Sequence, residues 1–292
     1  MTKGIIIAIQ EKYEHLLLSN IINLREKFHC YLPIELWQIG QEISDNMMAI
    51  LNKYKDRYNI HFNNVCEYTS NPEHWKGWQI KAFIMKYTNF KEVILCDCDS
   101  LFLINPEIIF NDDRYIKTGT FFFKDCLYHY PKNREIEMAE RKSFIRKLMP
   151  ERLPYFPEEW NYIYDLPDTV QSMWFYQESG VVFINKTMNT DIVNTIYELN
   201  DNHEETYKYV YGDKETFWIA CVMNNKPFAM NEKPGENYIK DDNLPQFLYT
   251  GENYPAFAHT YIYGGNESLF FSQKAYPFIK KTIPKMPLKL GF

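Results

Sequence analysis

The sequence predicts an α/β fold in which a mainly parallel sheet carries helices on both faces. Strand-like and helix-like segments alternate through the first third of the chain, and the runs at 4–9 and 93–96 are apolar throughout instead of alternating with polar residues. Strands of a parallel sheet are buried on both faces and therefore show such runs, while alternating strands and helices are typical of this fold class.

The predicted elements follow one another closely. In chain order they are a strand at 4–9, a helix over 16–24, a strand at 32–39, a helix with Asp45 as its cap, a strand at 65–68, a helix within 75–87 and a strand at 93–96. Ligands of such sheets bind outside the carboxyl ends of the strands. We therefore expect the residues after Ile9, Ile39 and Cys96 to border one cleft.

A segment of different character interrupts this pattern. Residues 128–169 are rich in charged and aromatic side chains and contain five prolines, and 135–148 within them is expected to form one helix. We interpret the segment either as an insertion over the cleft, acting as a lid or platform, or as a solvated surface excursion. Beyond it we expect a strand at 179–185, helices at 191–199 and 214–223, and an irregular tail.

Composition and charge exclude several classes of protein. With 46% hydrophobic and 24% charged residues, the chain has the composition of a folded protein and not of a disordered one. Its net charge is -6 and it contains no basic block, so we expect no nucleic acid as its main partner. Aromatic residues make up 17% of the chain, which suits the walls of a ligand cleft.

The cysteines and the apolar runs bear on the compartment. Six cysteines are scattered along the chain, and the spacing of Cys96 and Cys98 fits neither a zinc ribbon nor a thioredoxin motif, so we expect reduced thiols. The first apolar run is far too short for a signal peptide or a membrane span, and no other stretch reaches the required length. We expect a cytoplasmic protein without a membrane span.

The strongest single motif is an apolar strand that ends in two acidic residues at alternate positions, Asp97 and Asp99. Two carboxylates this close repel each other, and a divalent cation that binds both removes that cost while its open positions accept phosphate oxygens. Magnesium or manganese suits such oxygen ligands better than zinc. An Asp-x-Asp pair alone usually marks a solvated turn, but its place at the end of a buried strand favours a metal-diphosphate site.

Two further motifs flank this pair in the sequence. Lys81, in GWQIKA, lies on a mostly apolar helix face, where it either binds an anion or extends its ammonium group into water. Gln177, Glu178 and Gly180 stand at the start of the next apolar strand. Glycine at such a place permits the close approach of a ligand or a bend in the backbone.

Two candidates come later in the chain. Asp213, in YGDKETF, either contributes to the site or caps the next predicted helix. His259 follows a short apolar stretch, and a lone histidine is more often a hydrogen-bonded, partly buried residue than a ligand. It becomes a candidate metal ligand because an Asp-x-Asp pair leaves a cation short of protein ligands.

These motifs together resemble a known family. GWQIKA, DCDS, the Asn-Pro pair at 105–106, GTFFFKD, QESGVVFINK and YGDKETF resemble, in this order, the alpha-mannosyltransferases of fungal cell-wall and glycoprotein synthesis, the Mnn1-like group; LPIE at 32–35 also matches. The resemblance covers roughly residues 5–260. It implies a GT-A glycosyltransferase fold with a Rossmann-like mixed sheet flanked by helices, a divalent metal, usually manganese, and retaining transfer of mannose from GDP-mannose.

The resemblance also implies roles for single residues. The metal and the donor diphosphate would be held by Asp97, Asp99 and His259. Catalytic roles around the anomeric carbon, the acceptor and the sugar hydroxyls would fall to Glu178, Asp213 and Gln177. Contacts to the donor would come from Ala8, Ile9, Lys81, Cys98, Gly180 and Lys214.

The organisation expected from these assignments is one domain over 1–292. It consists of a nucleotide-sugar-binding half at 1–126, the insertion at 127–170 as a lid, and an acceptor and catalytic half at 171–292. The expected partners are a nucleotide-sugar donor and a glycan or glycoprotein acceptor. The sequence indicates no oligomeric state.

Other functions stay open at this point. The donor is GDP-mannose or a UDP-sugar, and a nucleotide-sugar-binding module without transfer activity is the main alternative. A metal-dependent nucleotidyltransferase or phosphohydrolase is disfavoured, because the first predicted strand is not followed by a glycine-rich phosphate loop. For a retaining reaction we favour direct attack from the leaving-group face over a covalent intermediate on Glu178 or Asp213.

Overall fold

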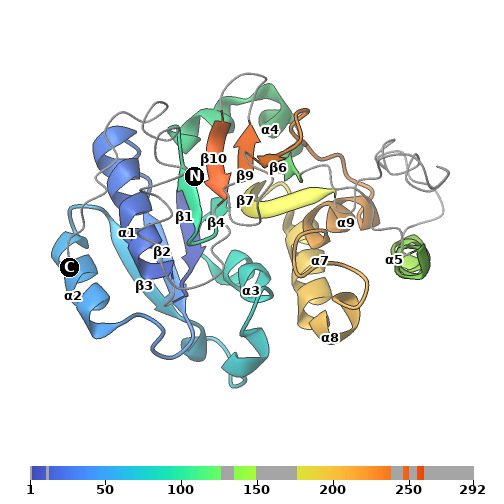
Figure 1. Cartoon of the computed structure of the whole chain (residues 1–292), viewed down its shortest axis with the longest axis horizontal. Coiled ribbons are helices and arrows are strands. Elements are labelled where there is room, and N and C mark those ends of the chain that lie inside the picture. The colour runs from blue at the N-terminus through green and yellow to red at the C-terminus, as the bar shows by residue number, and fades with distance from the viewer. Residues whose placement is uncertain are drawn as a thin grey trace.

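Two sheets organise the part of the chain that the structure describes. The computed structural model describes residues 2–10, 13–125, 135–148, 176–237, 246–249 and 255–259. Among these residues, six strands form a larger sheet in the order β3-β2-β1-β4-β7-β6, and four form a smaller sheet in the order β5-β10-β9-β8. The larger sheet runs through the centre of the molecule, with helices on both sides of it (Figure 1).

The strands are short, and most are bounded by turns or helices. The larger sheet contains β1 (Lys3–Ala8), β2 (Ile34–Gln38), β3 (Ile60–Asn64), β4 (Glu92–Cys96), β6 (Thr120–Lys124) and β7 (Gln177–Asn185). The smaller sheet contains β5 (Ser100–Phe102), β8 (Glu236–Asn237), β9 (Gln246–Tyr249) and β10 (Pro255–His259).

The helices connect these strands. They are α1 (Glu14–Ile22), which continues as a π-helical turn (Asn23–Lys27), α2 (Asp45–Tyr54), α3 (Ile80–Tyr87), α4 (Asp113–Thr118), α5 (Glu135–Leu148), α7 (Thr190–Asp201), α8 (His203–Thr206) and α9 (Thr216–Met223). Short 3₁₀ helices lie at Val65–Glu67, Pro72–Trp75 and Pro106–Asn111.

The larger sheet is mixed. Strands β3, β2, β1 and β4 run parallel, so that Ile5 of β1 pairs with Ile34 of β2 on one side and with Ile94 of β4 on the other. Strand β7 runs antiparallel to β4 and to β6. A mixed, Rossmann-like sheet flanked by helices was predicted together with the GT-A resemblance, and the predicted fold class is confirmed.

The apolar runs supply a core on each face of this sheet. Ile5 and Ile7 of β1 pack in one cluster with residues of α1 and α2, whereas Ile6 packs in a second cluster with α3, α7 and α9. All three isoleucines are fully buried. A strand covered on both faces needs apolar residues at consecutive positions, which is why the first strand was readable from the sequence.

Three predicted elements differ from the structure. The third strand is β3 (Ile60–Asn64), not 65–68, because the side chain of Asn64 accepts from the backbone N–H of Cys66 and starts a 3₁₀ helix there. Helix α3 begins at Ile80 instead of near residue 75, because Gly77 has a φ of 136°, which is not a helical backbone conformation. The cap of α2 is Ser44 and not Asp45, because its hydroxyl accepts from the N–H of Met47.

Two expectations concern the insertion and the tail. The predicted helix at 135–148 is confirmed as α5 (Glu135–Leu148), whereas the rest of 127–170 lies outside the described residues. The tail was expected to be irregular, but it contributes β8, β9 and β10 to the smaller sheet. No helix in the described ranges has the length and apolar character to cross a lipid bilayer. The division into two functional halves stays a prediction.

Candidate active site

Strand β4 delivers the Asp-x-Asp pair to the carboxyl-end edge of the sheet. All residues of β4 are buried, and the strand ends one residue before Asp97. The backbone N–H of Asp97 donates to the carbonyl of Gly180 at 2.9 Å, and the N–H of Ser100 donates back to the carbonyl of Asp97 at 3.0 Å. The pair therefore lies on a tight turn that is joined to β7.

A second anchor holds the far side of this turn. Asn20 of α1 is fully buried; its side-chain N–H donates to the carbonyl of Ser100 and its amide oxygen accepts from the N–H of Phe102, both at 2.9 Å. Cys98, between the two aspartates, donates from Sγ to the carbonyl of Ala8 at 2.9 Å. The turn is thus tied to α1, β1 and β7.

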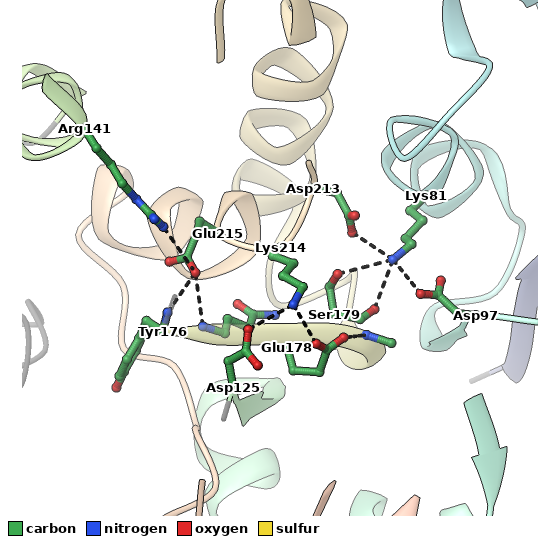
Figure 2. A network of polar contacts seen from close by, with 12 residues as sticks. Lys81, Asp97, Asp125, Arg141, Tyr176, Glu178, Ser179, Asp213, Lys214 and Glu215 are labelled. Carbon is green, nitrogen blue, oxygen red and sulfur yellow. Dashed lines mark hydrogen bonds and ion pairs between the residues drawn. The ribbon is translucent and has the colours of Figure 1, made fainter. Parts of the chain in front are cut away.

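Lys81 is the centre of the first polar cluster. Its Nζ lies 2.9 Å from Oδ2 of Asp97, 3.2 Å from Oδ2 of Asp213 and 3.2 Å from Oγ of Ser179. These three residues are far apart in the sequence. Figure 2 shows Asp97 and Asp213 on opposite sides of this ammonium group. We call Lys81, Asp97, Ser179 and Asp213 the Lys81 cluster.

The charge of Lys81 follows from its surroundings. Burial alone lowers the pKa of a lysine, but the carboxylates of Asp213 and Asp97 outweigh burial here and raise the pKa of Lys81 above its ordinary value. The side chain therefore stays protonated at neutral pH. Of the two acids, Asp97 is the more accessible, with 19% of its side chain exposed against 3% for Asp213.

Lys214 is the centre of a second polar cluster beside the first. Its Nζ lies 2.8 Å from Oε2 of Glu178 and 2.9 Å from Oδ2 of Asp125, and both acids are fully buried. Oε1 of Glu178 accepts from the backbone N–H of Gly180 at 2.8 Å. We call it the Lys214 cluster, and Figure 2 shows it beside β7, next to the Lys81 cluster.

An irregularity in β7 separates these residues from the regular sheet. Phe121 of β6 pairs with Phe183 of β7, but Phe123, two residues on, pairs with Glu178, five residues back. Bulges of this kind redirect side chains and are common beside active sites. The extra residues of β7 include Ser179 and Gly180, which contact Lys81 and Asp97.

Glu215 lies next to both clusters in the sequence but faces a different set of partners. Its carboxylate accepts from the backbone N–H groups of Tyr176 and Gln177 and from the indole of Trp218, and it lies 3.7 Å from Arg141 of α5. Burial raises the pKa of Glu215, and the charge of Arg141 opposes this. The ion pair attaches α5 to the YGDKETF segment.

The structure brings most of the predicted site residues together. Lys81, Asp97 and Asp213 form one cluster, and Lys214 and Glu178 form its neighbour. Gln177 is buried on another side, where its amide oxygen accepts from the backbone N–H of Trp218 at 3.2 Å. Ile9 is buried, and its N–H donates to the carbonyl of Trp37 in β2, which places the end of β1 within the sheet beside the Asp-x-Asp turn.

Three residues in or next to these clusters were not predicted from the sequence: Asp125, Ser179 and Glu215. Each stands in a motif that was quoted for the resemblance. Ser179 directly follows Glu178, and Glu215 directly follows Lys214, and both of these neighbours were predicted site residues. Their presence in those motifs was the available signal, but their partners, apart from Trp218, lie 38 to 98 residues away in the chain, which local spacing does not reveal.

Asp97 and Asp99 are the candidate ligands of a divalent cation. Within the described residues, no group of three His, Cys, Asp or Glu side chains is placed to hold a metal ion. Magnesium and related cations are often bound by one or two carboxylates together with substrate phosphates. A pair of carboxylates on a fixed turn fits such a cation, whose other positions a diphosphate would fill.

The third predicted metal ligand lies beside this pair along the backbone. In the pairing of β10 with β5, His259 is opposite Ser100, the residue that follows Asp99. Strand β10 therefore brings a segment more than 150 residues later in the chain to the edge of the Asp-x-Asp turn. The register places the backbone of His259 next to the turn, and its role as a metal ligand stays a prediction.

Comparison with protein families identifies the chain over most of its length. A family model described as "Mannosyltransferase putative" matches residues 2–242. The matched region contains every motif of the two clusters. Of the predicted site residues, only His259 lies beyond it.

Curated relatives carry mannosyltransferase names. "Putative alpha-1,3-mannosyltransferase MNN12" of Candida albicans is 28% identical over 178 residues, which is 58% of this chain and 19% of that protein. MNN13 of the same organism, named in the same way, is 25% identical and covers 83% of this chain and 36% of its own. "Alpha-1,3-mannosyltransferase MNT3" of Saccharomyces cerevisiae is 23% identical, with 80% and 39% covered. The chain thus spans well under half the length of these relatives.

Solved glycosyltransferase structures show a weak likeness. The galactosyltransferase LgtC, in complex with donor and acceptor sugar analogues, matches with a TM-score of 0.47 and 17% identity over 78% of this chain and 73% of its own. The mannosyltransferase Ktr4p of S. cerevisiae, in complex with GDP, matches with a TM-score of 0.47 and 13% identity over 78% and 67%.

Proposed function

The chain belongs to the family described as "Mannosyltransferase putative", and from this premise we propose that it is a metal-dependent glycosyltransferase that moves mannose from GDP-mannose to a glycan or glycoprotein acceptor with retention. The observation that supports this most strongly is the Lys81 cluster, which joins Asp97 of the Asp-x-Asp turn to Asp213 of YGDKETF. The alpha-1,3-mannosyltransferase names of the relatives favour mannose as the sugar. The cytoplasmic location stays a prediction.

In this proposal Asp97 and Asp99 hold a manganese or magnesium ion, with His259 as the candidate third ligand. The bound cation would offset the negative charge that develops on the departing diphosphate. The protein's own task is to fix the carboxylates beforehand. The backbone bonds of the turn and the ammonium group of Lys81 fulfil this task for Asp97.

Lys81 has a second task in this proposal. It stays positively charged between Asp97 and Asp213, so it brings a fixed cation to the place where the diphosphate carries its charge. Preorganised charges of this kind stabilise a transition state without reorganising during the reaction. Asp213 orients Lys81 from the side away from Asp97, and its binding of sugar hydroxyls stays a prediction.

We favour the direct route for the chemical step. The acceptor oxygen bonds to the anomeric carbon on the face from which the diphosphate oxygen departs, and the hydroxyl proton passes to a phosphate oxygen. Both oxygens of Glu178 are already engaged within the Lys214 cluster, by Gly180 and Lys214, whereas a nucleophile needs one oxygen directed at the sugar. Glu178 is therefore more suited to orienting β7 than to attacking the sugar.

The chemical route can be tested by trapping. A reaction quenched within the first turnover and digested with protease should contain no mannosylated peptide with Glu178 or Asp213. A glycosylated peptide that forms as fast as the product would establish the covalent route instead.

The donor can be identified by thermal shift. GDP-mannose with manganese should raise the melting temperature most among GDP- and UDP-sugars, and a chelator should abolish the rise, because a ligand stabilises the folded state that binds it. Asp99→Ala should lose the metal-dependent part of the rise, while Asp56→Ala, at an exposed position, serves as the control. A rise with a UDP-sugar alone would change the assigned donor.

Transfer itself needs a separate measurement. Incubation with labelled GDP-mannose, manganese and methyl α-D-mannopyranoside should give a labelled disaccharide. Donor binding without transfer to this acceptor or to water would make the protein a nucleotide-sugar-binding module.

A further inference from the structure

Two exposed aromatic side chains lie next to each other beside the Lys81 cluster. Trp78 is 48% exposed and Tyr211 is 49% exposed, and their ring centroids are 5.2 Å apart with an angle of 39° between the planes. Among the exposed large hydrophobic residues of the described ranges, these two alone are in ring contact with each other. Apolar area that stays in water at such a place commonly marks a binding surface.

The chain connects this pair directly to the candidate active site. Trp78 precedes Lys81 by three residues in the turn before α3, and the backbone N–H of Lys81 donates to the carbonyl of Trp78 at 3.2 Å. Tyr211 precedes Asp213 by two residues. Because Lys81 and Asp213 form an ion pair, the aromatic pair adjoins the Asp213 side of the Lys81 cluster.

The indole of Trp78 packs against the backbone of Gly212. Gly212 has φ of 60°, and a Cβ built on it would lie 2.6 Å from Cε3 of Trp78, so only glycine lets the backbone approach the ring this closely. Next to Trp78 in the chain, the buried side chain of Gln79 donates to the carbonyls of His74 and Lys76 and fixes the loop before α3. A surface ring that is preorganised in this way can bind with little loss of conformational entropy.

The chemistry of the surroundings favours a sugar ring over other ligands. A pyranose has one apolar face of C–H groups, which packs on an aromatic ring, and a rim of hydroxyl groups, which needs charged or polar partners. The aromatic pair supplies the first, and the phenol group of the half-exposed Tyr211 supplies a polar partner for the second. The diphosphate is assigned to the opposite end of the Lys81 cluster, at Asp97 and Asp99, which leaves this end for the sugar that receives the transferred unit.

We infer that Trp78 and Tyr211 form an acceptor subsite, in which the indole of Trp78 stacks on the apolar face of a pyranose ring and Tyr211 borders it. The inference rests on the proposed glycosyl transfer and deepens it, since it names the surface that the acceptor occupies.

The test compares binding and kinetics for three variants. Trp78→Ala removes the ring, Trp78→Phe keeps a smaller one, and Tyr31→Ala removes an exposed ring, 63% exposed, on the segment before β2, as a matched control. Methyl α-D-mannopyranoside binding is measured by saturation-transfer NMR without donor, and GDP binding with manganese by calorimetry. Melting temperatures verify that each variant is folded, and Tyr211→Ala with Trp78→Phe replaces Trp78→Ala if that variant does not fold.

The expected result is selective for the acceptor. Trp78→Ala should weaken methyl mannoside binding, and raise the KM for it as acceptor, about tenfold, as for the loss of one stacked ring, whereas Trp78→Phe should lose less. GDP affinity should stay within about twofold of the wild type, and Tyr31→Ala should change nothing. The tenfold change corresponds to about 1.4 kcal/mol.

Two outcomes would overturn the inference: unchanged mannoside binding in Trp78→Ala, or a loss of GDP affinity with mannoside binding intact, which would assign the ring to the nucleotide base. The proposed function fails separately. A wild-type protein that binds mannoside through Trp78 but transfers no mannose refutes the transfer and supports the subsite, while normal transfer with an unaltered acceptor KM in Trp78→Ala refutes the subsite alone.

Discussion

The Lys81 cluster and the Lys214 cluster have the same arrangement of charges, but their carboxylates differ in access to solvent. Each places one lysine between two carboxylates beside β7, with distances of 2.8 to 3.2 Å. In the Lys214 cluster both acids are fully buried, whereas Asp97 of the Lys81 cluster keeps 19% of its side chain exposed.

This difference separates two uses of the same ionic arrangement. Two fully buried carboxylates around a lysine fix the chain but offer no ligand to a cation, and the net stabilisation is small because desolvation opposes it. An ion pair with one accessible carboxylate is held in place and can still bind a cation. We therefore expect the Lys81 cluster to carry the chemistry and the Lys214 cluster to hold β7 and β6 together.

The largest expected effect separates the two clusters by activity. Asp97→Asn should reduce transfer about 10³-fold, because a charge at the developing diphosphate is lost, with little change in the melting temperature. Asp125→Asn, in the Lys214 cluster, should lower the melting temperature clearly but transfer by less than about tenfold. Steady-state kinetics and thermal melts of both variants test this, and equal losses of activity would show that both clusters act on the substrate.

Replacement of the two lysines sharpens the comparison through stability. Removing one partner of a buried ion pair costs about 3–5 kcal/mol. We expect Lys214→Met to reach this range, since two fully buried carboxylates then lose their cation, and Lys81→Met to cost less, since Asp97 is partly hydrated. Lys81→Met should nevertheless be the variant with the larger loss of donor affinity. Urea unfolding and calorimetry with GDP measure the two effects, and the reverse order of stability would contradict the assignment.

A third lysine, outside both clusters, gives the smallest effect and tests the origin of the charge. Lys186 donates to the carbonyls of Lys86 and Thr88, at 3.0 and 2.7 Å, with only the more remote Glu35 opposing its desolvation, and burial lowers its pKa to about 8. Two adjoining carboxylates thus decide whether a buried lysine of this protein has a raised or a lowered pKa.

The sign of the resulting pH dependence can be worked out. Between pH 8 and the ordinary lysine pKa of 10.5, the unfolded chain binds a proton at Lys186 that the folded chain does not, so this group makes the free energy of unfolding rise with pH across that window. The stability difference between the wild type and Lys186→Met should change accordingly when urea midpoints are measured across the window. A constant difference would mean that the pKa of Lys186 is not lowered.

The fold was predictable where the local pattern is determined by burial on both sides. The runs at 4–9 and 93–96 correspond to β1 (Lys3–Ala8) and β4 (Glu92–Cys96) within one residue, and the helix at 135–148 agrees with α5. The third strand was predicted too late in the chain because only Ile60 of β3 is buried, whereas the buried Val65 that follows belongs to a 3₁₀ helix. The antiparallel direction of β7 relative to its neighbours β4 and β6 depends on the path of the chain between the strands, which no local pattern contains.

The site was predictable as a set of motifs but not as a geometry. Lys81, Asp97 and Asp213 were each selected from the sequence, and the structure joins them around one ammonium group. The role of Asp213 as a helix cap is not observed, because α9 begins after Glu215. The aromatic pair was not recognised, since Trp78 was placed on a helix face and precedes the helix instead. The cluster around Lys81 depends on contacts across long sequence separations, whereas the position of Trp78 before α3 follows from the backbone of Gly77.

The bonds of Asn20 to the Asp-x-Asp turn have a consequence for the kinetics of donor recognition. From a separate helix, the buried amide of Asn20 donates to the carbonyl of Ser100 and accepts from the N–H of Phe102, so the turn has its final shape before a nucleotide binds. A loop that needs no ordering step adds no slow phase to association. Stopped-flow mixing should then record a single exponential whose observed rate constant rises linearly with nucleotide concentration. In Asn20→Ala this rate constant should instead reach a plateau at high nucleotide concentration, because the turn must first become ordered.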